Sequence, residues 1–343
     1  MQSNGRDERG HYFGSHGRYS LVCVAAATFR DSRSRAKTPK WKRTSSEFEW
    51  LFKVSLDYHW PGMVDTTNRI PIPGAAPARA LQHISTLASG GPLDPSLDVH
   101  LQFHPDRLHR GEPLLRVLGR EGLYRSQFET GSSNGGLTAH PGGDRWLWES
   151  RMFGGAYDSA PAHERPKYGA LNYRRRPTGA APRFGSSFFR LEPGVLARTT
   201  FCYPDSVFEP HHFGTMTNMS LIALAQSDHR DPLDDAIEAH VHGPVRLASD
   251  VEALVLDPSY RGTSVEESAR ELPCGIEWHP GFLLTADKLS RHPDYRGPEV
   301  VALGLTIARE GVLTPALLGE AANSGRYDAQ ALKKVWHCVA RFG

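Results

Sequence analysis

The sequence predicts an α+β protein, and three features of its pattern indicate this class. The segment 97–107, LDVHLQFHPDR, alternates apolar and polar residues, which is typical of a β-strand. The segment 298–342 instead carries apolar residues at helical spacing, for example Val335 and Val339. The 33 glycines and 25 prolines among 343 residues indicate many turns, and therefore short strands.

The other expected elements follow in chain order. A helix closed by glycine is predicted over 80–90, and a second helix that ends in a glycine pair over 143–155. Five β-prone runs separated by turns are predicted at 168–173, 184–191, 198–203, 236–245 and 250–258. Two or three helices are expected in the tail. Together these elements predict a compact mixed sheet with helices packed at both ends.

Composition divides the chain into three regions. Residues 1–45 carry 10 Lys or Arg against three acidic side chains, so this segment is predicted to be a disordered basic arm. An arm that contacts nucleic acid or anionic lipid is the alternative. Residues 46–79 are predicted to hold a short element and a Pro-rich linker. Residues 80–343 are predicted to form a single α+β domain, with a helical C-terminal segment at 298–343.

Charge and cysteine usage limit the classes of partner. The 40 basic and 38 acidic residues leave a net charge of +2, so nucleic acid is not expected as a partner except through the basic arm. The four cysteines have no paired spacing, which favours a reducing compartment. The apolar run at 21–29 is too short to span a bilayer. We therefore expect a cytoplasmic protein without a membrane partner.

The segment IEAHVHGPV predicts a strand with one unusually polar face. Alternation sends Ile237 to one face and Glu238, His240 and His242 to the other. One interpretation is an exposed face with solvated side chains. The other is the wall of a site, with the Glu238 carboxylate beside two imidazoles.

The loop in LYRSQFETGSSNGG, residues 123–136, opens directly after an arginine. One interpretation is a plain turn, because glycine and asparagine tolerate positive φ. The other is a phosphate cradle formed by backbone amides and a guanidinium. The candidate anion-binding residues of this loop are Arg125, Ser126, Gly131, Asn134 and Gly135.

Histidines offer an alternative chemistry. His211 and His212 in EPHHFGT, together with His240 and His242, are candidate ligands of a metal-dependent hydrolase. However, the sequence contains no HExxH motif, no HxHxD motif and no closely spaced cysteine pair. We therefore expect no metal. A phosphate-loop NTPase is excluded because GxxxxGK[ST] does not occur.

Several long motifs carry a family resemblance. LQFHPDR, GLYRSQFETGSSNGG, RPKYGALNY, FGSSFFRL and IEAHVHGPVRLASDVEALVLDPSY resemble, in this order, the domain of unknown function 3626 family. Their order is also similar to that of the ADP-ribosyltransferase superfamily, in which an early strand bears Arg or His, a middle strand Ser and a late strand a catalytic Glu. This likeness implies a split, mixed or antiparallel sheet with flanking helices.

The same resemblance implies an NAD site. Arg125 in LYRS would bind the pyrophosphate, Ser186 or Ser187 in FGSS would orient the ribose or the acid, and Glu238 would be catalytic. Enzymes of that superfamily break the nicotinamide–ribose bond of NAD and pass ADP-ribose to an acceptor. The implied partners are NAD and a protein or other macromolecular acceptor, or water.

Three further residues belong to the expected NAD site. Tyr168, followed by Gly169, would stack on nicotinamide, and His240 would line the site beside Glu238. Many arginine-modifying members have an acidic or amide residue two positions before the catalytic Glu, where this chain has Ala236. A catalytically silent binding module is the remaining alternative.

Overall fold

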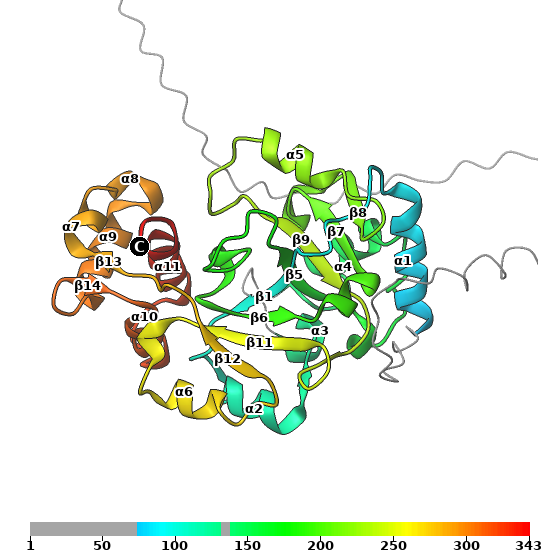
Figure 1. The fold of residues 1–343 in the computed structure, drawn as a ribbon. Coiled ribbons are helices and arrows are strands. Elements are labelled where there is room, and N and C mark those ends of the chain that lie inside the picture. The colour runs from blue at the N-terminus through cyan, green and yellow to red at the C-terminus, as the bar shows by residue number, and fades with distance from the viewer. Residues whose placement is uncertain (1–73, 132–137) are drawn as a thin grey trace, which may run out of the picture. The chain divides into compact units, whose positions relative to one another are not determined.

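The computed structural model describes residues 74–131 and 138–343, which belong to one compact unit, Asn68–Gly343. In this part of the chain an eight-stranded sheet is accompanied by helices, which confirms the predicted α+β class (Figure 1). The predicted basic arm at 1–45, and most of the segment 46–79, lie outside the described residues.

The main sheet has the strand order β12-β11-β6-β1-β5-β9-β7-β8. Neighbouring strands are antiparallel, except that β11 and β12 are parallel. The strands are β1 (Val99–Phe103), β5 (Lys167–Leu171), β6 (Ser187–Leu191), β7 (Thr199–Tyr203), β8 (His212–Thr215), β9 (Ile237–Val241), β11 (Val251–Leu256) and β12 (Gly275–Trp278).

Strand β9 lies inside the sheet, between β5 and β7. Glu238 pairs with Ala170 on β5 and with Cys202 on β7, while His240 pairs with Tyr168 on β5. Directly opposed residues of neighbouring strands point to the same face, so these side chains share one face of the sheet. Ala239, between the two acid–base residues, points to the other face.

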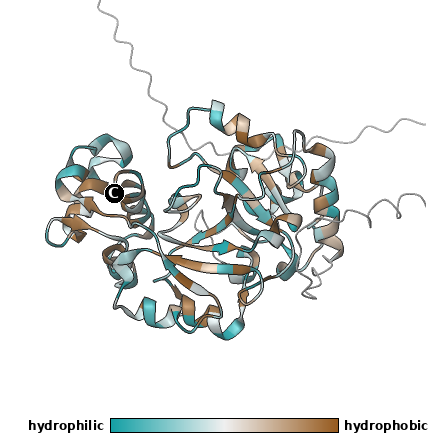
Figure 2. Ribbon diagram, viewed as in Figure 1, coloured by the Kyte–Doolittle hydropathy of each residue, from teal (hydrophilic) through white to brown (hydrophobic). Residues whose placement is uncertain are grey.

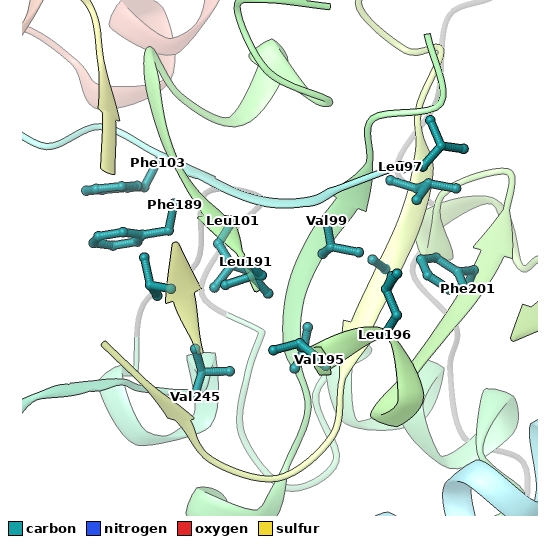
Figure 3. Packing of buried hydrophobic residues seen from close by; sticks show 14 of the residues in the cluster. Leu97, Val99, Leu101, Phe103, Phe189, Leu191, Val195, Leu196, Phe201 and Val245 are labelled. Carbon is teal, nitrogen blue, oxygen red and sulfur yellow. The ribbon is translucent and has the colours of Figure 1, made fainter. Parts of the chain in front are cut away.

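That other face carries the largest hydrophobic cluster of the described residues. The rings of Phe103 and Phe189, on the adjacent strands β1 and β6, stack with their centroids 4.9 Å apart (Figure 3). Ile237, Ala239 and Val241 are completely buried in the same cluster. A one-residue slip of β9 would move these three side chains to the face that carries Glu238 and His240, and would bury Glu238 in the hydrophobic core, so the packing fixes the direction of Glu238.

Helices and short strands complete the described structure. The α-helices are α1 (Ala75–Leu87), α2 (Leu114–Glu121), α3 (Gln127–Thr130), α4 (Asp144–Met152), α5 (Leu221–Ser227), α6 (Ser264–Ala269), α7 (Ala286–Ser290), α8 (Pro293–Arg296), α9 (Pro298–Ile307), α10 (Pro315–Asn323) and α11 (Ala329–Phe342). The 3-10 helices are η1 (Ala162–Glu164), η2 (Pro182–Phe184), η3 (Pro193–Arg198), η4 (Ser206–Phe208) and η5 (Pro258–Tyr260). The short strands pair β2 (Leu108–His109) with β3 (Glu112–Pro113), β4 (Leu123–Tyr124) with β10 (Val245–Arg246), and β13 (Leu284–Thr285) with β14 (Val312–Leu313).

Helices α1 and α4 cover the Glu238 face near β7 and β8. Ile84 of α1 and Met152 of α4 belong to one buried cluster with Phe153, Cys202 and Phe213. Because α1 and α4 lie over this face of the sheet, its polar residues are removed from solvent. It also brings the N-terminal half of α4 close to Glu238.

The C-terminal helices pack around a separate hydrophobic cluster that includes Val335 and Val339 of α11. The indole Nε1 of Trp336 donates a 3.0 Å hydrogen bond to the Pro182 carbonyl in η2. This bond ties α11 to a segment that lines the site described below. The predicted helical tail is therefore present, as α9, α10 and α11.

Two local expectations need correction. Helix α1 begins at Ala75, inside the segment predicted as a linker, because Pro77 lies in the first turn, where its missing N–H costs no hydrogen bond. The strand β1 is buried on both faces rather than on one. Hydrophilic residues interrupt the hydrophobic ones along the strands of the sheet (Figure 2). Among the described residues, no helix is both long enough and apolar enough to cross a membrane.

Candidate active site

Glu238 is held in place on β9 by three neighbouring side chains. His240 Nε2 donates a 2.8 Å hydrogen bond to Glu238 Oε1, and Ser206 Oγ donates across 3.2 Å to Oε2. The Cys202 thiol lies 3.8 Å from Oε1. The Thr200 hydroxyl lies 3.4 Å from His240 Nδ1, which leaves the Nε2 proton for Glu238. The carboxylate therefore has a fixed orientation before any ligand binds.

The pKa of Glu238 lies below its ordinary value, although the residue is only 8% exposed. Burial alone raises the pKa of a carboxyl group. Here the hydrogen bond and attraction of His240, the charge of Arg145 and the Ser206 hydrogen bond outweigh burial, so the pKa of Glu238 lies below its ordinary value. A buried carboxylate that keeps its charge can stabilise a positive charge that develops nearby.

Arg145 of α4 connects this carboxylate to the aromatic wall of the site. Its Nη1 donates a 3.3 Å hydrogen bond to Ser206 Oγ, and its guanidinium lies 4.2 Å from the ring centroid of Tyr168 and 4.9 Å from that of Trp148. Stacking on aromatic rings leaves the edge N–H groups of a guanidinium available for hydrogen bonds. The Nε of Arg145 has no hydrogen-bond partner among the residues that the structure describes.

A buried ion pair supports Tyr168 from behind. The Tyr168 hydroxyl donates to Glu149 Oε1 across 3.0 Å, and Arg165 Nη1 lies 2.6 Å from Glu149 Oε2. Burial raises the pKa of Glu149 to about 7, although Arg165 and Tyr168 act in the opposite direction. The ring of Tyr168 therefore has a fixed position against Arg145.

Asp205 is a second carboxylate near Glu238. It caps η4 by accepting a 3.0 Å hydrogen bond from the Val207 amide. Burial and the negative charge of Glu238 raise the pKa of Asp205 to about 7. Two carboxyl groups with pKa values shifted in opposite directions are typical of sites that need one ionised group and one proton carrier.

One cavity, with a volume of about 190 Å³, is lined by Arg145, Tyr168, Asp205 and Glu238. Its aromatic wall comprises Tyr124, Trp148, Tyr168, Phe184 and Phe208. Its charged groups are Arg145, Arg183, Lys333, Asp205, Asp234 and Glu238. Arg183 and Asp234 form an ion pair with each other, whereas Lys333 forms none with the described residues. A cavity with an aromatic wall, paired carboxylates and cations suits a polar ligand that has a flat ring.

Tyr168, Gly169 and Glu238 were predicted from the sequence, and the structure brings all three to this cavity. Gly169 is required there, since a Cβ at this position would lie 2.5 Å from the His100 carbonyl oxygen on β1. His240 lies behind Glu238 and is only 1% exposed. The alternative of an exposed, solvated strand face for Glu238, His240 and His242 is therefore wrong, because α1 and α4 cover it.

Arg125 does not line the Glu238 cavity. Its Nε lies 2.6 Å from Glu121 Oε2 and its Nη1 lies 3.2 Å from Glu129 Oε1, so two carboxylates already neutralise the guanidinium. It lines a neighbouring cavity of about 340 Å³. The two cavities share Tyr124, Gln127 and Tyr168 in their walls.

The other predicted residues of the loop have structural tasks or lie outside the described residues. Ser126 is the N-cap of α3, and its hydroxyl also donates a 2.7 Å hydrogen bond to the Ala162 carbonyl. Gly131 ends α3 with φ 63°, a conformation that favours glycine. Asn134 and Gly135 lie outside the described residues.

The two serines of FGSS do not meet Glu238. Two strands, β1 and β5, lie between β6 and β9 in the sheet. Ser186 Oγ lies 3.1 Å from the Tyr260 hydroxyl, and Ser187 Oγ accepts a 3.2 Å hydrogen bond from the Asp257 amide. Both serines therefore stabilise the connections of β6.

Four charged residues of the cavity were not predicted from the sequence: Arg145, Asp205, Arg183 and Lys333. Arg145 lies in a helix and Asp205 in a turn after a strand, places where a charged residue usually has a structural role. No local motif marks either residue. They meet Glu238 only because α4 and η4 pack over the polar face of β9.

The structure also groups potential metal ligands. Cys202, Glu238 and His240 are buried, and their ligand atoms lie within 4.8 Å of one another. His211 and His212, which the sequence suggested as metal ligands, are exposed, and His212 pairs with Tyr203 in a register that points it away from Cys202. His242 instead contacts Tyr157 and Thr200. The hypothesis of four histidines at one ion is therefore not supported by their positions.

The fold and the site define an α+β protein with a buried carboxylate in a cavity that has an aromatic wall and further charged groups. The family model described as "Protein of unknown function (DUF3626)" matches residues 98–229 and 215–342, so the chain belongs to this family. Arg145, Tyr168, Asp205 and Glu238 all lie within the matched residues. No curated protein matches the chain.

Proposed function

We propose that the protein cleaves the nicotinamide–ribose bond of NAD and passes ADP-ribose to water or to a macromolecular acceptor. Glu238 is the catalytic residue in this proposal. The observation that carries it is the Glu238 carboxylate, fixed by His240 and Ser206 in the wall of a cavity that also holds the Tyr168 ring. The order of motifs that resembles the ADP-ribosyltransferases supports the same reaction.

The proposed chemistry uses the two carboxyl groups differently. When the C–N bond breaks, its electron pair leaves with nicotinamide, and positive charge develops on the ribose ring. The ionised Glu238 stabilises this charge more strongly than it stabilises the neutral ribose of the bound substrate. A nucleophilic hydroxyl or water then forms the new bond to the ribose carbon, and Asp205 accepts its proton. A pKa of about 7 suits Asp205 to this task near neutral pH.

The size of the site defines how NAD would bind. A cavity of about 190 Å³ is too small for a dinucleotide, since sites for drug-sized ligands occupy ~300–1,000 Å³. The neighbouring cavity of about 340 Å³ shares Tyr124, Gln127 and Tyr168 with it as wall residues. In this proposal the nicotinamide ribose lies at Glu238, and the remainder of NAD extends towards Arg125. An NAD phosphate would have to compete with Glu121 and Glu129 for that guanidinium.

Water is the acceptor that we favour within this proposal. Position 236, two residues before Glu238, is alanine and lines the cavity, so β9 supplies no second acid for an arginine acceptor. Asp205 is the available proton acceptor instead. Cytoplasmic action is part of the proposal, because the described cysteines Cys202, Cys274 and Cys338 are free thiols, as expected in a reducing compartment.

Release of nicotinamide from NAD tests the proposal. The purified protein should release nicotinamide, measured by chromatography, and Glu238→Gln should lower the rate about a hundredfold or more. NAD binding should persist in this variant, because the amide has the same shape. Glu252→Gln, at a half-exposed carboxylate that pairs with Arg190, is the matched control. Absence of nicotinamide release by the unchanged protein, or full activity in Glu238→Gln, would contradict the proposal.

The cluster of Cys202, Glu238 and His240 favours a second candidate, a metal-dependent hydrolase. The sulfur lies 3.8 Å from Glu238 Oε1 and 3.9 Å from His240 Nε2, separations that resemble those between ligands of one tetrahedral Zn²⁺. Three protein ligands beside a cavity leave a fourth position for water. Elemental analysis separates the two candidates, since a stoichiometric metal that Cys202→Ser removes would support the hydrolase and contradict Glu238 as a free carboxylate.

A further inference from the structure

A chain of buried hydrogen bonds continues from His240 away from the cavity at Glu238. Thr200 Oγ1 lies 3.4 Å from His240 Nδ1 and 2.9 Å from His242 Nε2. The Tyr157 hydroxyl lies 2.6 Å from His242 Nδ1. Together with the 2.8 Å bond between His240 Nε2 and Glu238 Oε1, these contacts connect four side chains to the carboxylate in one row. Tyr157, Thr200 and His242 do not line the cavity, so they can affect a ligand there only through His240.

The fold brings the members of this chain together from three segments. His240 lies on β9, and Thr200 is its directly opposed partner on β7, so both side chains point to the face that carries Glu238. His242 follows two residues after His240 and keeps to the same side. Tyr157 comes from the connection after α4, the helix that covers this face.

The members of the chain are closed off from solvent. Tyr157, Thr200 and His242 are 0% exposed, and His240 is 1% exposed. The Phe153 ring makes T-shaped contacts with both imidazoles, with ring centroids 5.2 Å from His240 and 5.3 Å from His242. An apolar ring offers no competing hydrogen bond, and a buried polar atom without a partner is costly. Each member therefore depends on its neighbours in the chain.

The direction of the hydrogen bonds follows from the two ends of the chain. A carboxylate accepts hydrogen bonds and donates none, so at the Glu238 end the proton lies on His240 Nε2. At the other end, the Tyr157 hydroxyl has no acceptor besides His242 Nδ1 among the described residues, so it donates there. His242 Nε2 then donates to Thr200, whose hydroxyl donates to His240 Nδ1. Both imidazoles thus carry their proton on Nε2, and every donor in the row has an acceptor.

We propose that Thr200, His242 and Tyr157 are positioning residues, which orient the Glu238 carboxylate by holding His240 in one tautomer and one ring orientation. The hydrogen bond at one nitrogen of an imidazole sets which nitrogen carries the proton. A ring bonded at both nitrogens cannot turn without breaking a hydrogen bond, so its Nε2 donor stays on Glu238. The expected effect on catalysis rests on the proposed function of Glu238, whereas the tautomers do not.

Nitrogen-15 NMR spectra of the purified protein with labelled histidine test the tautomers directly. The signals of His240 and His242 are assigned by their loss in His240→Asn and His242→Asn. Both rings should carry a proton on Nε2 and none on Nδ1. Thr200→Val keeps the side-chain shape and removes the hydroxyl, so it should shift the His240 Nδ1 signal towards that of a nitrogen without a hydrogen bond. A proton on Nδ1 of either ring in the unchanged protein would overturn the proposal.

The rate of nicotinamide release tests whether the chain acts on Glu238. Thr200→Val should lower kcat about tenfold and leave KM for NAD little changed, because a hydrogen bond that positions the acid is lost. Thr200→Ser keeps the hydroxyl and should restore most of the rate. Thr199→Val is the matched control, because Thr199 is a buried neighbour on β7 whose hydroxyl donates to the Val195 carbonyl instead. Full activity in Thr200→Val, or an equal loss in Thr199→Val, would contradict the proposal.

Tyr157→Phe tests the far end of the chain. It should lower kcat about threefold on its own and cause no further loss in the Thr200→Val background, where the chain is already broken. Losses that add in the double variant would show that Tyr157 does not act through His240. The spectra separate this proposal from the proposed function. A protein that releases no nicotinamide, yet carries the Nε2 proton on both rings, would contradict NAD cleavage and support the hydrogen-bond chain.

Discussion

The His240 imidazole donates from Nε2 to Glu238 Oε1 across 2.8 Å, and only Ala239 separates the two residues on β9. Alternation along a strand places residues i and i+2 on one face, so this contact follows from the strand itself. Thr200 on β7 holds the other side of the ring. The acid and its positioning histidine therefore form one rigid unit.

We predict that His240→Asn lowers the rate of nicotinamide release about tenfold, because Glu238 loses the donor that orients its carboxylate. The change should act mainly on kcat, with KM for NAD little altered. His212→Asn, at an exposed histidine on β8, is the matched control and should keep full activity. A loss confined to KM would argue that His240 contacts the ligand instead of positioning Glu238.

A second prediction concerns the buried ion pair behind Tyr168. Arg165→Met leaves the Glu149 carboxylate without its cation, in a place where both side chains are at most 4% exposed. The free energy of unfolding at pH 8 should fall by about 3–5 kcal/mol, measured by urea denaturation. The loss should be smaller at pH 5, where Glu149 can take up a proton.

The chain provides a matched control for this measurement. Arg151 and Glu209 form an ion pair whose side chains are about half exposed. Arg151→Met should cost less than about 1 kcal/mol at either pH, because water solvates the remaining carboxylate. Equal losses of unfolding free energy in the two variants would show that burial of the Arg165–Glu149 pair does not increase the cost of removing its arginine.

A third prediction tests the close approach of β5 to β1. Gly169→Ala places a Cβ where it would be 2.5 Å from the His100 carbonyl oxygen, so the strands must separate. We expect a loss of about 1–3 kcal/mol in unfolding free energy, measured by thermal or urea denaturation. Gly194→Ala, where no atom lies within 4 Å of the added Cβ, should leave stability unchanged or slightly raised. Full stability in Gly169→Ala would mean that β5 can shift without cost.

A fourth prediction concerns pH. Burial, together with the charges of Arg183, Arg296 and Lys333, lowers the pKa of His337 from its ordinary 6.5 to about 3. The folded protein thus binds fewer protons here than the unfolded chain does. The contribution of His337 to stability is complete above pH 6.5 and is lost progressively as the pH falls from 6.5 towards 3.

The stability of the unchanged protein should therefore decrease below pH 6.5, with a contribution from His337 of up to about 1.4 kcal/mol per pH unit. His337→Gln cannot titrate, so its unfolding free energy, measured by urea denaturation at pH 7.5 and 5.5, should change less between the two values. Other buried histidines act in the same direction, which makes the difference between the two proteins the decisive quantity. An equal pH dependence in both proteins would contradict the lowered pKa.

The local sequence pattern predicted where the strands lie, but it did not predict which other side chains their residues contact. The alternation of Val99, Leu101 and Phe103 depends only on the geometry of one strand, so it appears in the sequence and in β1 alike. Arg125 is a residue whose contacts the local pattern did not predict. Its loop was interpreted from the sequence as a plain turn or as a phosphate cradle, whereas the structure shows that Glu121 and Glu129, four residues away on either side, pair with the Arg125 guanidinium.

The sequence by itself determined that Glu238 and His240 share one strand face, because a period of two residues is a property of the backbone. Only the tertiary structure decided that this face is buried, since α1 and α4 come from distant parts of the chain to cover it. It also decided that Arg145 and Asp205, and neither Ser186 nor Ser187, reach the cavity at Glu238. Strand order and helix packing are set by the whole hydrophobic core, so no local motif could have specified these neighbours.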